Sequence, residues 1–491
     1  MTTESLWNQF RAICQIPHPS GHVEALRQYI IAQVQQAGLV ADADAAGNIR
    51  VEIPASSGWE EKARRQGRPL AETTTLQAHI DMVPQADSDV KFDFLADGLR
   101  LREVGDLVTA DGTTLGADNG IGVAAMLAVV ADEALAKNLT HGPLELLFTV
   151  DEETGMEGAS RLKPHWLKGS QLINLDTERE GDLMVGCAGA VDLNVTYRYK
   201  LERGIPEGDR AVLVTLGGLK GGHSGMDIHL GRGNACKMMV RFLKHAVVSF
   251  EARVAWVQGG GVRNAIPREA SAVLTVPEEV VGELLDEATY YGELFRYELR
   301  GVDEDVLFTA HVTDAPQWLL PEEVQDDILN SLEAAPDGLF RYSPDLPTVV
   351  ETSSNLASIA MTQDGDNGRC DIVALVRSLN EEMKRALSSR LQSCFILGGA
   401  RVYFTAAYPG WEQPLATTLP QRIRTAYRQL FQTEMHVNSV HCGLECGIIH
   451  EIYPELDIVS LGPTIHHPHS PAESVEKSSV ERFWRLLEEI I

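Results

Sequence analysis

Short apolar runs alternate with helical patterns along the first third of the chain. Apolar residues recur at helical spacing over 5–14 and 22–37, and an alanine-rich segment over 120–130 predicts a third helix. Short apolar runs lead into His79 and into Asp176, which is typical of strands that are buried on both faces. Strands that alternate with helices predict an α/β domain with a mostly parallel sheet flanked by helices.

The pattern changes twice along the chain. In the middle, the strands alternate between apolar and polar residues, as in an antiparallel sheet with one exposed face, and the α/β pattern returns towards the end. We therefore expect an α+β domain over 189–407, inserted into a first domain that is built from 1–188 and 408–491. Two further expectations are a charged loop over 58–68 and a final helix over 472–490.

Composition narrows the class of partner. With 42 Lys and Arg against 70 Asp and Glu, the formal net charge of −28 argues against binding to nucleic acid or to an anionic membrane. No run of about 18 apolar residues and no signal-peptide pattern is visible, so we expect no membrane association and a cytoplasmic location. The seven cysteines are scattered, which is typical of free thiols in a reducing compartment.

Acidic residues and a histidine gather just beyond the apolar runs. His79-Ile80-Asp81 ends one run, Asp118 lies in a glycine-rich turn, Asp151-Glu152-Glu153 follows a second run, and Asp176 ends a third. Because α/β enzymes place their chemistry beyond the ends of parallel strands, we expect these segments to converge. One histidine and several carboxylates form a ligand set for a pair of divalent metal ions.

Each of these segments also has a plain structural interpretation. His79 could be an ordinary strand-end histidine, or a metal ligand whose second ring nitrogen is anchored by Asp81. Asp118 could cap the helix that follows, or bridge two cations. The carboxylates of 151–153 repel one another unless water or cations neutralise them. Adjacent glutamates can have different roles, since one can bind metal while the other takes a proton from metal-bound water.

A histidine-rich turn near the end of the chain offers the remaining ligand. His466, His467 and His469 all lie between Gly462 and Glu473. Spacing alone does not choose among the three histidines.

These segments together resemble the M20 metallopeptidases, and within them the group that cleaves aminoacyl-histidine dipeptides. The matching pieces span nearly the whole chain, so the resemblance extends far beyond one short motif. They are 79–83 (HIDMV), 116–120 (GADNG), 151–155 (DEETG), 174–176 (NLD), 221–225 (GGHSG), 441–447 (HCGLECG) and 462–471, which ends in His469-Ser470-Pro471.

The resemblance implies a zinc-peptidase-like catalytic domain with two Zn²⁺ ions, for which Co²⁺ or Mn²⁺ can substitute. It also implies that the inserted domain is a lid that carries the contacts of a homodimer. In this interpretation Asp118 bridges the two ions, Glu152 is the general base and Asp81 orients His79. The implied metal ligands are His79, Asp118, Glu153, Asp176 and His469, the last because it directly precedes Ser-Pro and an acidic residue.

Four further residues gain a role from the resemblance. His223 would stabilise the oxyanion, and Asn264 and Arg377 would contact the substrate, where an arginine fork suits a C-terminal carboxylate. Glu445 would meet the free substrate amine. His223 has a plain alternative as a surface histidine, and Asn264 and Arg377 have one as structural hydrogen-bonding residues.

The expected function is zinc-dependent hydrolysis of dipeptides with an unblocked N-terminus, with broad specificity that includes carnosine-like Xaa-His dipeptides. The alternatives within enzymes are a related tripeptidase or an amidohydrolase such as a deacylase. The alternative outside enzymes is a metal-binding protein without catalysis. Glu152 argues against that last alternative, because a site that only binds metal does not need the second glutamate.

Overall fold

The computed structural model describes residues 3–135 and 138–491, and the chain divides into two compact units. The first, unit 1, takes up the chain as far as Cys187, together with Trp411–Ser439 and Leu444–Ile491. The second, unit 2, consists of Ala188–Gly410 and Val440–Gly443. The polypeptide therefore leaves unit 1 twice, first for the long segment that forms most of unit 2 and again for the four residues Val440–Gly443.

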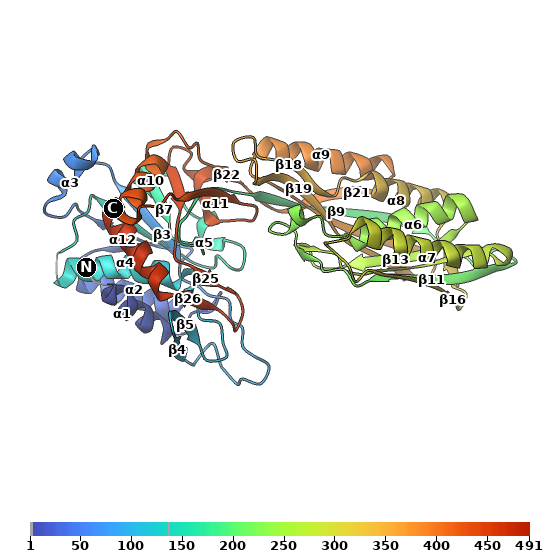
Figure 1. The fold of residues 1–491 in the computed structure, drawn as a ribbon, viewed down its shortest axis with the longest axis horizontal. Helices are drawn as coiled ribbons and strands as arrows, with labels where there is room; N and C mark the ends of the chain where they lie inside the picture. The colour runs from blue at the N-terminus through green and yellow to red at the C-terminus, as the bar shows by residue number, and fades with distance from the viewer. Residues whose placement is uncertain (1–2, 136–137) are drawn as a thin grey trace. The chain divides into compact units, whose positions relative to one another are not determined.

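Unit 1 is built on a mixed sheet whose centre is parallel (Figure 1). The four central strands β6, β3, β7 and β24 run parallel to one another. The strands on either side of them pair antiparallel, so the prediction of a mostly parallel sheet describes only the centre. In sheet order the strands are β1 (Ala41–Ala43), β2 (Ile49–Ile53), β6 (Leu144–Thr149), β3 (Thr74–His79), β7 (Gln171–Asn174), β24 (Asp457–Ser460), β8 (Asp182–Cys187) and β22 (Trp411–Glu412), with β23 (His436–Val440) on β8.

The four parallel strands are buried along their whole length except at Asp457 in β24, as expected for strands that are covered on both faces. All six residues of β3 and all six of β6 are buried. Helix α4 packs against β3, and α10 and α11 pack against β24. The helices of unit 1 are α1 (Glu4–Cys14), α2 (Glu24–Gln36), α3 (Trp59–Gln66), α4 (Ala117–Leu135), α5 (Glu157–Ser160), α10 (Thr418–Phe431), α11 (Glu445–Ile452) and α12 (Lys477–Ile490).

Two predictions in unit 1 are wrong. The charged segment over 58–68 forms helix α3 rather than a loop, because Trp59 and Ala63 are buried on one face of it. The final helix begins at Lys477 and not at residue 472, because the residues before it extend as strand β26 (Ser474–Glu476). This strand pairs with β5 (Leu107–Ala110) in a small antiparallel sheet that also contains β4 (Leu101–Val104) and β25 (Ile465–His466).

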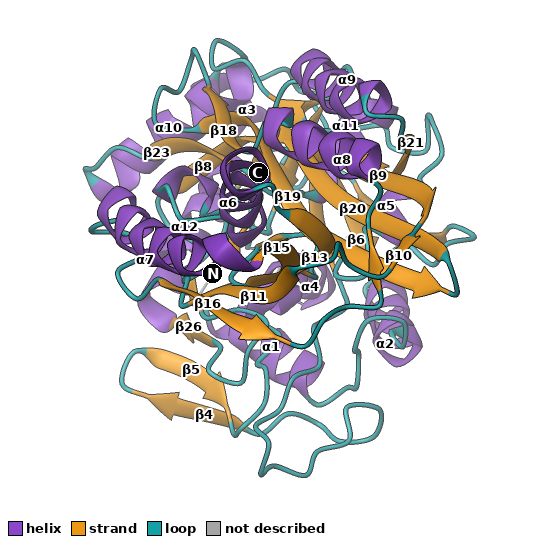
Figure 2. Cartoon of the chain, turned by 90° about the vertical axis from the view of Figure 1, so that its right-hand side faces the viewer, coloured by secondary structure: helices purple, strands orange, loops and turns teal. Residues whose placement is uncertain are grey.

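Unit 2 is an antiparallel sheet covered by four long helices (Figure 2). The helices are α6 (Ala235–Phe250), α7 (Val281–Glu298), α8 (Glu322–Ala334) and α9 (Glu381–Leu397), and Phe242 and Phe295 are among the residues buried between helices and sheet. In sheet order the strands are β16 (Leu307–Thr313), β11 (Asp209–Gly217), β15 (Ala270–Pro277), β13 (Arg253–Gly260), β19 (Val350–Asp364), β20 (Asn367–Ser378), β9 (Gly189–Lys200) and β21 (Arg401–Tyr408), with β18 (Gly338–Tyr342) on β19.

Two short ribbons complete unit 2. Strand β12 (Gly222–His223) pairs with β14 (Ala265–Ile266), and β10 (Glu202–Arg203) pairs with β17 (Trp318–Leu319). Across the described parts of both units, none of the helices is both long enough and apolar enough to cross a membrane.

Candidate metal centre

The candidate centre lies where the central strands of unit 1 end. Strand β3 ends at His79, directly beside Thr149 at the end of β6. On its other side, β3 pairs with β7, which ends two residues before Asp176. Because the three strands are parallel, the segments that follow them leave the sheet at the same edge. This register brings together side chains that are far apart in the sequence.

Asp118 lies between two imidazole rings. Its Oδ1 atom is 3.1 Å from Nε2 of His79, and its Oδ2 atom is 3.1 Å from Nε2 of His469. Asp118 stands at the start of α4, but its backbone is not helical (φ −84°, ψ 106°). One carboxylate therefore has each of its oxygens directed at a different histidine, which is the arrangement required of a bridging ligand.

Two further carboxylates complete the two halves of the centre. Asp176 Oδ1 lies 3.3 Å from Nε2 of His79, and Glu153 Oε1 lies 2.9 Å from Nε2 of His469. One half thus contains His79, Asp118 and Asp176, and the other contains Asp118, Glu153 and His469. In each half the three ligand atoms lie within 4.8 Å of one another.

These residues fit a pair of divalent cations in both spacing and chemistry. Ligand atoms around a tetrahedral zinc ion, bound at about 2.0–2.2 Å, are roughly 3.3–3.6 Å apart. The separations of 2.9–3.3 Å within the two halves are close to that spacing. Imidazole nitrogen and carboxylate oxygen are the ligands that zinc and related cations accept.

The clustered carboxylates of the centre favour the binding of positive charge. Hydrogen bonds to Asp118 and to Glu153 raise the pKa of His469 to about 11. Burial raises the pKa of Asp176 to about 6, and the charge of Asp118 adds to the effect. Several carboxylates share a small buried volume, so cations stabilise their ionised forms.

Asp81 forms a second layer behind these ligands. Its carbonyl oxygen lies 3.1 Å from Nδ1 of His79 and its Oδ1 atom 3.4 Å. Its carboxylate accepts hydrogen bonds from the backbone N–H groups of Glu152 (to Oδ1, 3.0 Å) and Glu153 (to Oδ2, 3.3 Å). The hydroxyl of Ser20 also donates to it, at 2.8 Å. Asp81 therefore fixes both the ring of His79 and the turn that carries the two glutamates.

The two glutamates differ in environment. Spacing alone admits either as a ligand, since Glu152, Glu153 and His79 also form a group within 4.8 Å. Burial raises the pKa of Glu152 well above its usual value, and the charges of Asp176 and Glu153 raise it further against the opposing effect of His79. A raised pKa suits a group that accepts and then returns a proton near neutral pH.

His223 lies in unit 2 with its tautomer fixed. Its Nδ1 atom accepts hydrogen bonds from the backbone N–H groups of Gly225 (3.2 Å) and Met226 (3.0 Å). The proton of the neutral ring is therefore on Nε2, which leaves Nε2 as a donor. Burial lowers the pKa of His223, and the nearby Arg377 lowers it further, so the ring is neutral at neutral pH.

Arg377 and Asn264 also belong to unit 2. Arg377 is buried on β20, where its Nη1 donates to the hydroxyl of Tyr408 at 3.0 Å, while its Nε has no hydrogen-bond partner among the described residues. Asn264 is exposed just before β14, and its carbonyl oxygen accepts from the N–H of Ser224, next to His223. Both residues therefore lie near His223 within unit 2.

Glu445 lies below the surface of unit 1, which does not suit contact with a substrate amine. Its side chain is fully buried, and Oε2 accepts hydrogen bonds from Gln77 (2.6 Å) and Thr149 (2.7 Å). Gln77 in turn accepts from Asn174 at 2.6 Å. These residues form a polar layer one step below the strand ends, so Glu445 supports the sheet beneath the centre.

Sequence reasoning missed three residues that hold the ligands. Ser20 binds Asp81, Asn119 donates to Asp176, and Glu473 binds the backbone of the segment that carries Asp118. Ser20 lies in the Pro-His-Pro-Ser-Gly break, Asn119 lies inside the 116–120 motif, and Glu473 follows the 462–471 motif. The motifs drew attention to these positions, but nothing in the sequence indicates their long-range partners.

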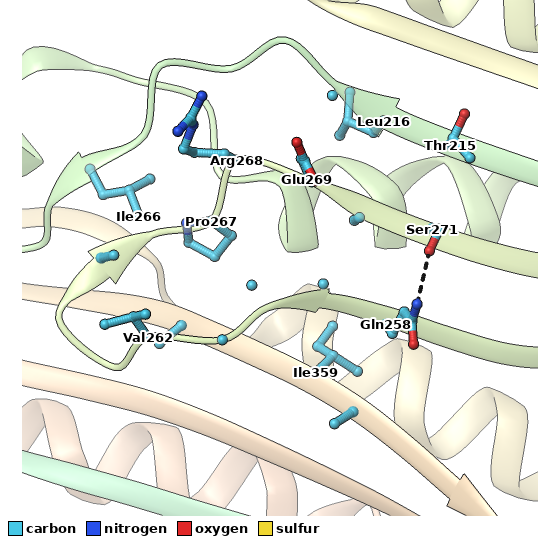
Figure 3. Close-up of a pocket in the computed structure, with 18 of the residues that line it drawn as sticks. Thr215, Leu216, Gln258, Val262, Ile266, Pro267, Arg268, Glu269, Ser271 and Ile359 are labelled. Carbon is cyan, nitrogen blue, oxygen red and sulfur yellow. Dashed lines mark hydrogen bonds between the residues drawn. The ribbon is translucent and has the colours of Figure 1, made fainter. Parts of the chain in front are cut away.

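A separate hollow of about 950 Å³ lies against the sheet of unit 2 (Figure 3). Its lining includes Thr215, Gln258 and Ser271, and Gln258 donates to Ser271 at 3.4 Å. None of the candidate metal ligands lines this hollow, so it is not part of the candidate metal centre.

The chain belongs to the peptidase family M20/M25/M40. The model of that family matches residues 75–491, which include every candidate ligand. The chain is thus a peptide hydrolase, and its family is the one that its motifs resemble.

Two relatives match over nearly their full lengths. The cytosol non-specific dipeptidase of Escherichia coli K12 is 40% identical over 492 residues, which covers 100% of this chain and 98% of the relative. The crystal structure of aminoacylhistidine dipeptidase from Vibrio alginolyticus is 40% identical, has a TM-score of 0.88, and is matched over 99% of this chain and 95% of its own. A tripeptidase from Staphylococcus aureus, 15% identical with a TM-score of 0.59 and matched over 100% of this chain and 98% of its own, shares the fold.

The three histidines of the final turn can be separated by mutation. His466 is paired with Glu476 at 2.8 Å, away from the centre, whereas His469 faces Asp118 and Glu153. We expect His469→Ala to lose about one bound metal per chain, because one half of the centre loses its only nitrogen ligand. His466→Ala is the matched control and should keep both. Metal content after dialysis measures the difference, and equal retention in the two variants would remove His469 from the ligand set.

Proposed function

We propose that the chain is a dipeptidase that uses two divalent cations, with zinc preferred, to cleave dipeptides that have a free N-terminus. Xaa-His dipeptides are among the proposed substrates, within a broad specificity. The observation that carries the proposal is Asp118, whose two oxygens each face a histidine. Full-length similarity to two dipeptidases supports the choice of substrate class.

The proposed ligands divide between two ions. His79 and Asp176 would hold one ion, Glu153 and His469 would hold the other, and Asp118 would bridge both. Two divalent cations bound in this way polarise the scissile carbonyl and provide a water-derived nucleophile at neutral pH. Asp81 keeps Nε2 of His79 directed at the centre by holding the opposite side of the ring.

Glu152 is the proposed general base. It takes a proton from the attacking water, and returns it to the nitrogen of the peptide bond as that bond breaks. One carboxylate thus carries the proton from the water to the leaving amine. Burial, together with the negative charges of Asp176 and Glu153, raises the pKa of Glu152 and makes it a stronger base than an ordinary glutamate.

Unit 2 is proposed to supply the remaining substrate contacts. His223 donates from Nε2 to the oxygen that gains negative charge as the carbonyl is attacked. Arg377 binds the C-terminal carboxylate of the dipeptide, because its buried guanidinium has an Nε–H without a hydrogen-bond partner among the described residues, and a guanidinium can bind a planar anion through two N–H groups. Asn264, exposed beside His223, is a further polar contact for the peptide.

A cytoplasmic homodimer is the proposed form of the protein, with unit 2 as lid and dimer-forming domain. The charge of −28 favours a small peptide over nucleic acid or an anionic membrane as the partner. The relative from Escherichia coli is described as cytosolic, which supports the location. Sedimentation velocity measures the assembly, and a monomer at micromolar concentration would remove the dimer from the proposal.

The substrate class can be tested on a panel of small peptides. Dipeptides should be cleaved once metal is supplied, whereas tripeptides and N-acylated amino acids should be cleaved poorly. Faster cleavage of tripeptides would favour the related tripeptidase activity, and faster cleavage of N-acyl compounds would favour a deacylase. Metal binding without hydrolysis of any compound would indicate a protein that has lost catalysis.

Glu152→Gln should keep both metals and lose nearly all turnover. The amide cannot accept a proton from water, and a general base contributes roughly 10²–10⁴-fold to the rate. Glu157→Gln is the matched control, because Glu157 is exposed and paired with Arg161. The measurements are kcat and metal content. A kcat close to that of the control would exclude Glu152 as the base, and lost metal would make it a ligand.

His223→Ala should lower kcat by roughly 10²–10³-fold, as is usual for loss of one oxyanion donor. Metal content should stay normal and KM should change little, because the donor acts on charge that develops only during the reaction. His229→Ala, an exposed histidine of the same unit, is the control. Unchanged kcat in His223→Ala would end this assignment.

Arg377→Lys should raise KM for dipeptides by roughly 10–100-fold, because hydrogen bonds to a charged group contribute about 1.5–3 kcal/mol. A lysine keeps the charge but loses the planar fork. Dipeptide amides lack the carboxylate, so the substitution should hardly alter their hydrolysis. An equal effect on acids and amides would show that Arg377 does not bind the carboxylate.

A further inference from the structure

Glu473 is a buried carboxylate beside the centre that no proposed step of the reaction uses. It is 2% exposed. Its Oε2 atom accepts hydrogen bonds from the N–H groups of Leu115 (2.8 Å) and Gly116 (3.0 Å). Its Oε1 atom accepts from Ala117 (2.8 Å) and, more weakly, from Asp118 (3.4 Å). One side chain thus satisfies four consecutive backbone donors.

These four donors belong to the segment that delivers Asp118 to the centre. The segment precedes the regular part of α4, and Gly116 adopts a left-handed backbone (φ +66°). A side chain at position 116 would have its Cβ 3.0 Å from Sδ of Met82, so the turn is also tightly packed. Buried N–H groups need acceptors, and here a carboxylate supplies what a helix or sheet would otherwise provide.

The backbone of Glu473 is tied to the turn that carries His469. His469 itself has a left-handed backbone (φ +60°), which is uncommon for a residue with a side chain. The N–H of Glu473 donates to the carbonyl of Ser470 at 3.0 Å, and the carbonyl of Glu473 accepts from the hydroxyl of Thr109 at 2.8 Å. The strained turn is therefore closed at one end by Glu473.

Glu473 consequently joins two segments that are 351 residues apart in the sequence but must present Asp118 and His469 to one ion. We propose that Glu473 is a positioning residue that sets the separation of these two ligands, and so the affinity of the half-site formed by Asp118, Glu153 and His469. The proposal rests on the ligand assignment given above. It requires a group that only accepts hydrogen bonds, because every partner of the side chain is a donor.

The isosteric variant Glu473→Gln tests this requirement. Its amide replaces one acceptor oxygen by a donor that faces two N–H groups, which pushes the Asp118 segment away from its position. We expect metal binding to weaken by roughly 10–100-fold, as is common when a group behind a ligand is changed. Titration of the metal-free protein with Co²⁺ against a chelator measures affinity, and the Co²⁺ absorption spectrum reports a changed ligand geometry.

Two controls separate positioning from general stability. Thr109→Val removes the hydrogen bond to the carbonyl of Glu473, but leaves its carboxylate and the backbone donors of the Asp118 segment in place. Glu476→Gln makes the same chemical change three residues further along. Both should keep the Co²⁺ affinity and spectrum of the unaltered chain, even where Thr109→Val lowers the melting temperature.

A second variant, Glu473→Asp, keeps the acceptor-only chemistry with a shorter reach. It should recover part of the Co²⁺ affinity and spectrum that Glu473→Gln loses. Unchanged affinity and spectrum in Glu473→Gln would overturn the proposal, as would equal losses in Gln and Asp that follow the melting temperature, or failure of both to fold. Because the readout is metal binding, Glu473 can position ligands even in a chain that proves to cleave no dipeptide.

Discussion

The repulsion among carboxylates at one edge of a buried sheet is the constraint on which the rest of unit 1 depends. Asp118, Asp176 and two glutamates share a volume in which their ligand atoms lie a few ångströms apart. Such a group is stable only beside positive charge. Two imidazole rings lie among these oxygens. Hydrogen bonds to carboxylates raise the pKa of His469, and burial together with the charge of Asp118 raises the pKa of Asp176. Divalent cations would offset the repulsion more completely than protons.

Holding these ligands against their repulsion takes a second set of contacts. Among the candidate ligands, Glu153 and His469 lie in turns and Asp176 follows the end of β7, where the backbone has few hydrogen bonds of its own. Asp81 binds the N–H groups of the glutamate turn, and Glu473 binds those of the Asp118 segment. Both are buried acceptors that bind backbone donors, so each positions a ligand without occupying a place in the proposed metal sphere. A small displacement of either acceptor would move a whole turn.

Unit 2 has a different chemical character. It offers a neutral imidazole whose Nδ1 accepts from backbone donors, and a buried guanidinium whose Nε–H has no partner within the described parts of the chain. Both are donors, and both suit an anionic or partly anionic ligand. In the proposed function, the acidic centre of unit 1 would bind cations and these donors of unit 2 would bind oxygens of the peptide. The proposed dipeptidase needs both.

The sequence by itself determined the elements and motifs whose signal is local. Buried parallel strands appear as continuous apolar runs, so the positions of His79 and Asp176 at strand ends could be predicted from the chain alone. Only the tertiary structure decided what depends on distant partners. Four features depend on residues that are remote in sequence. They are the buried face of α3, the strand β26 that precedes α12, the burial of Glu445 and the contacts of Glu473. Local sequence patterns indicate helix and strand propensity and periodicity. The long-range partner of a side chain is determined only by the packing of strands and turns in the folded chain.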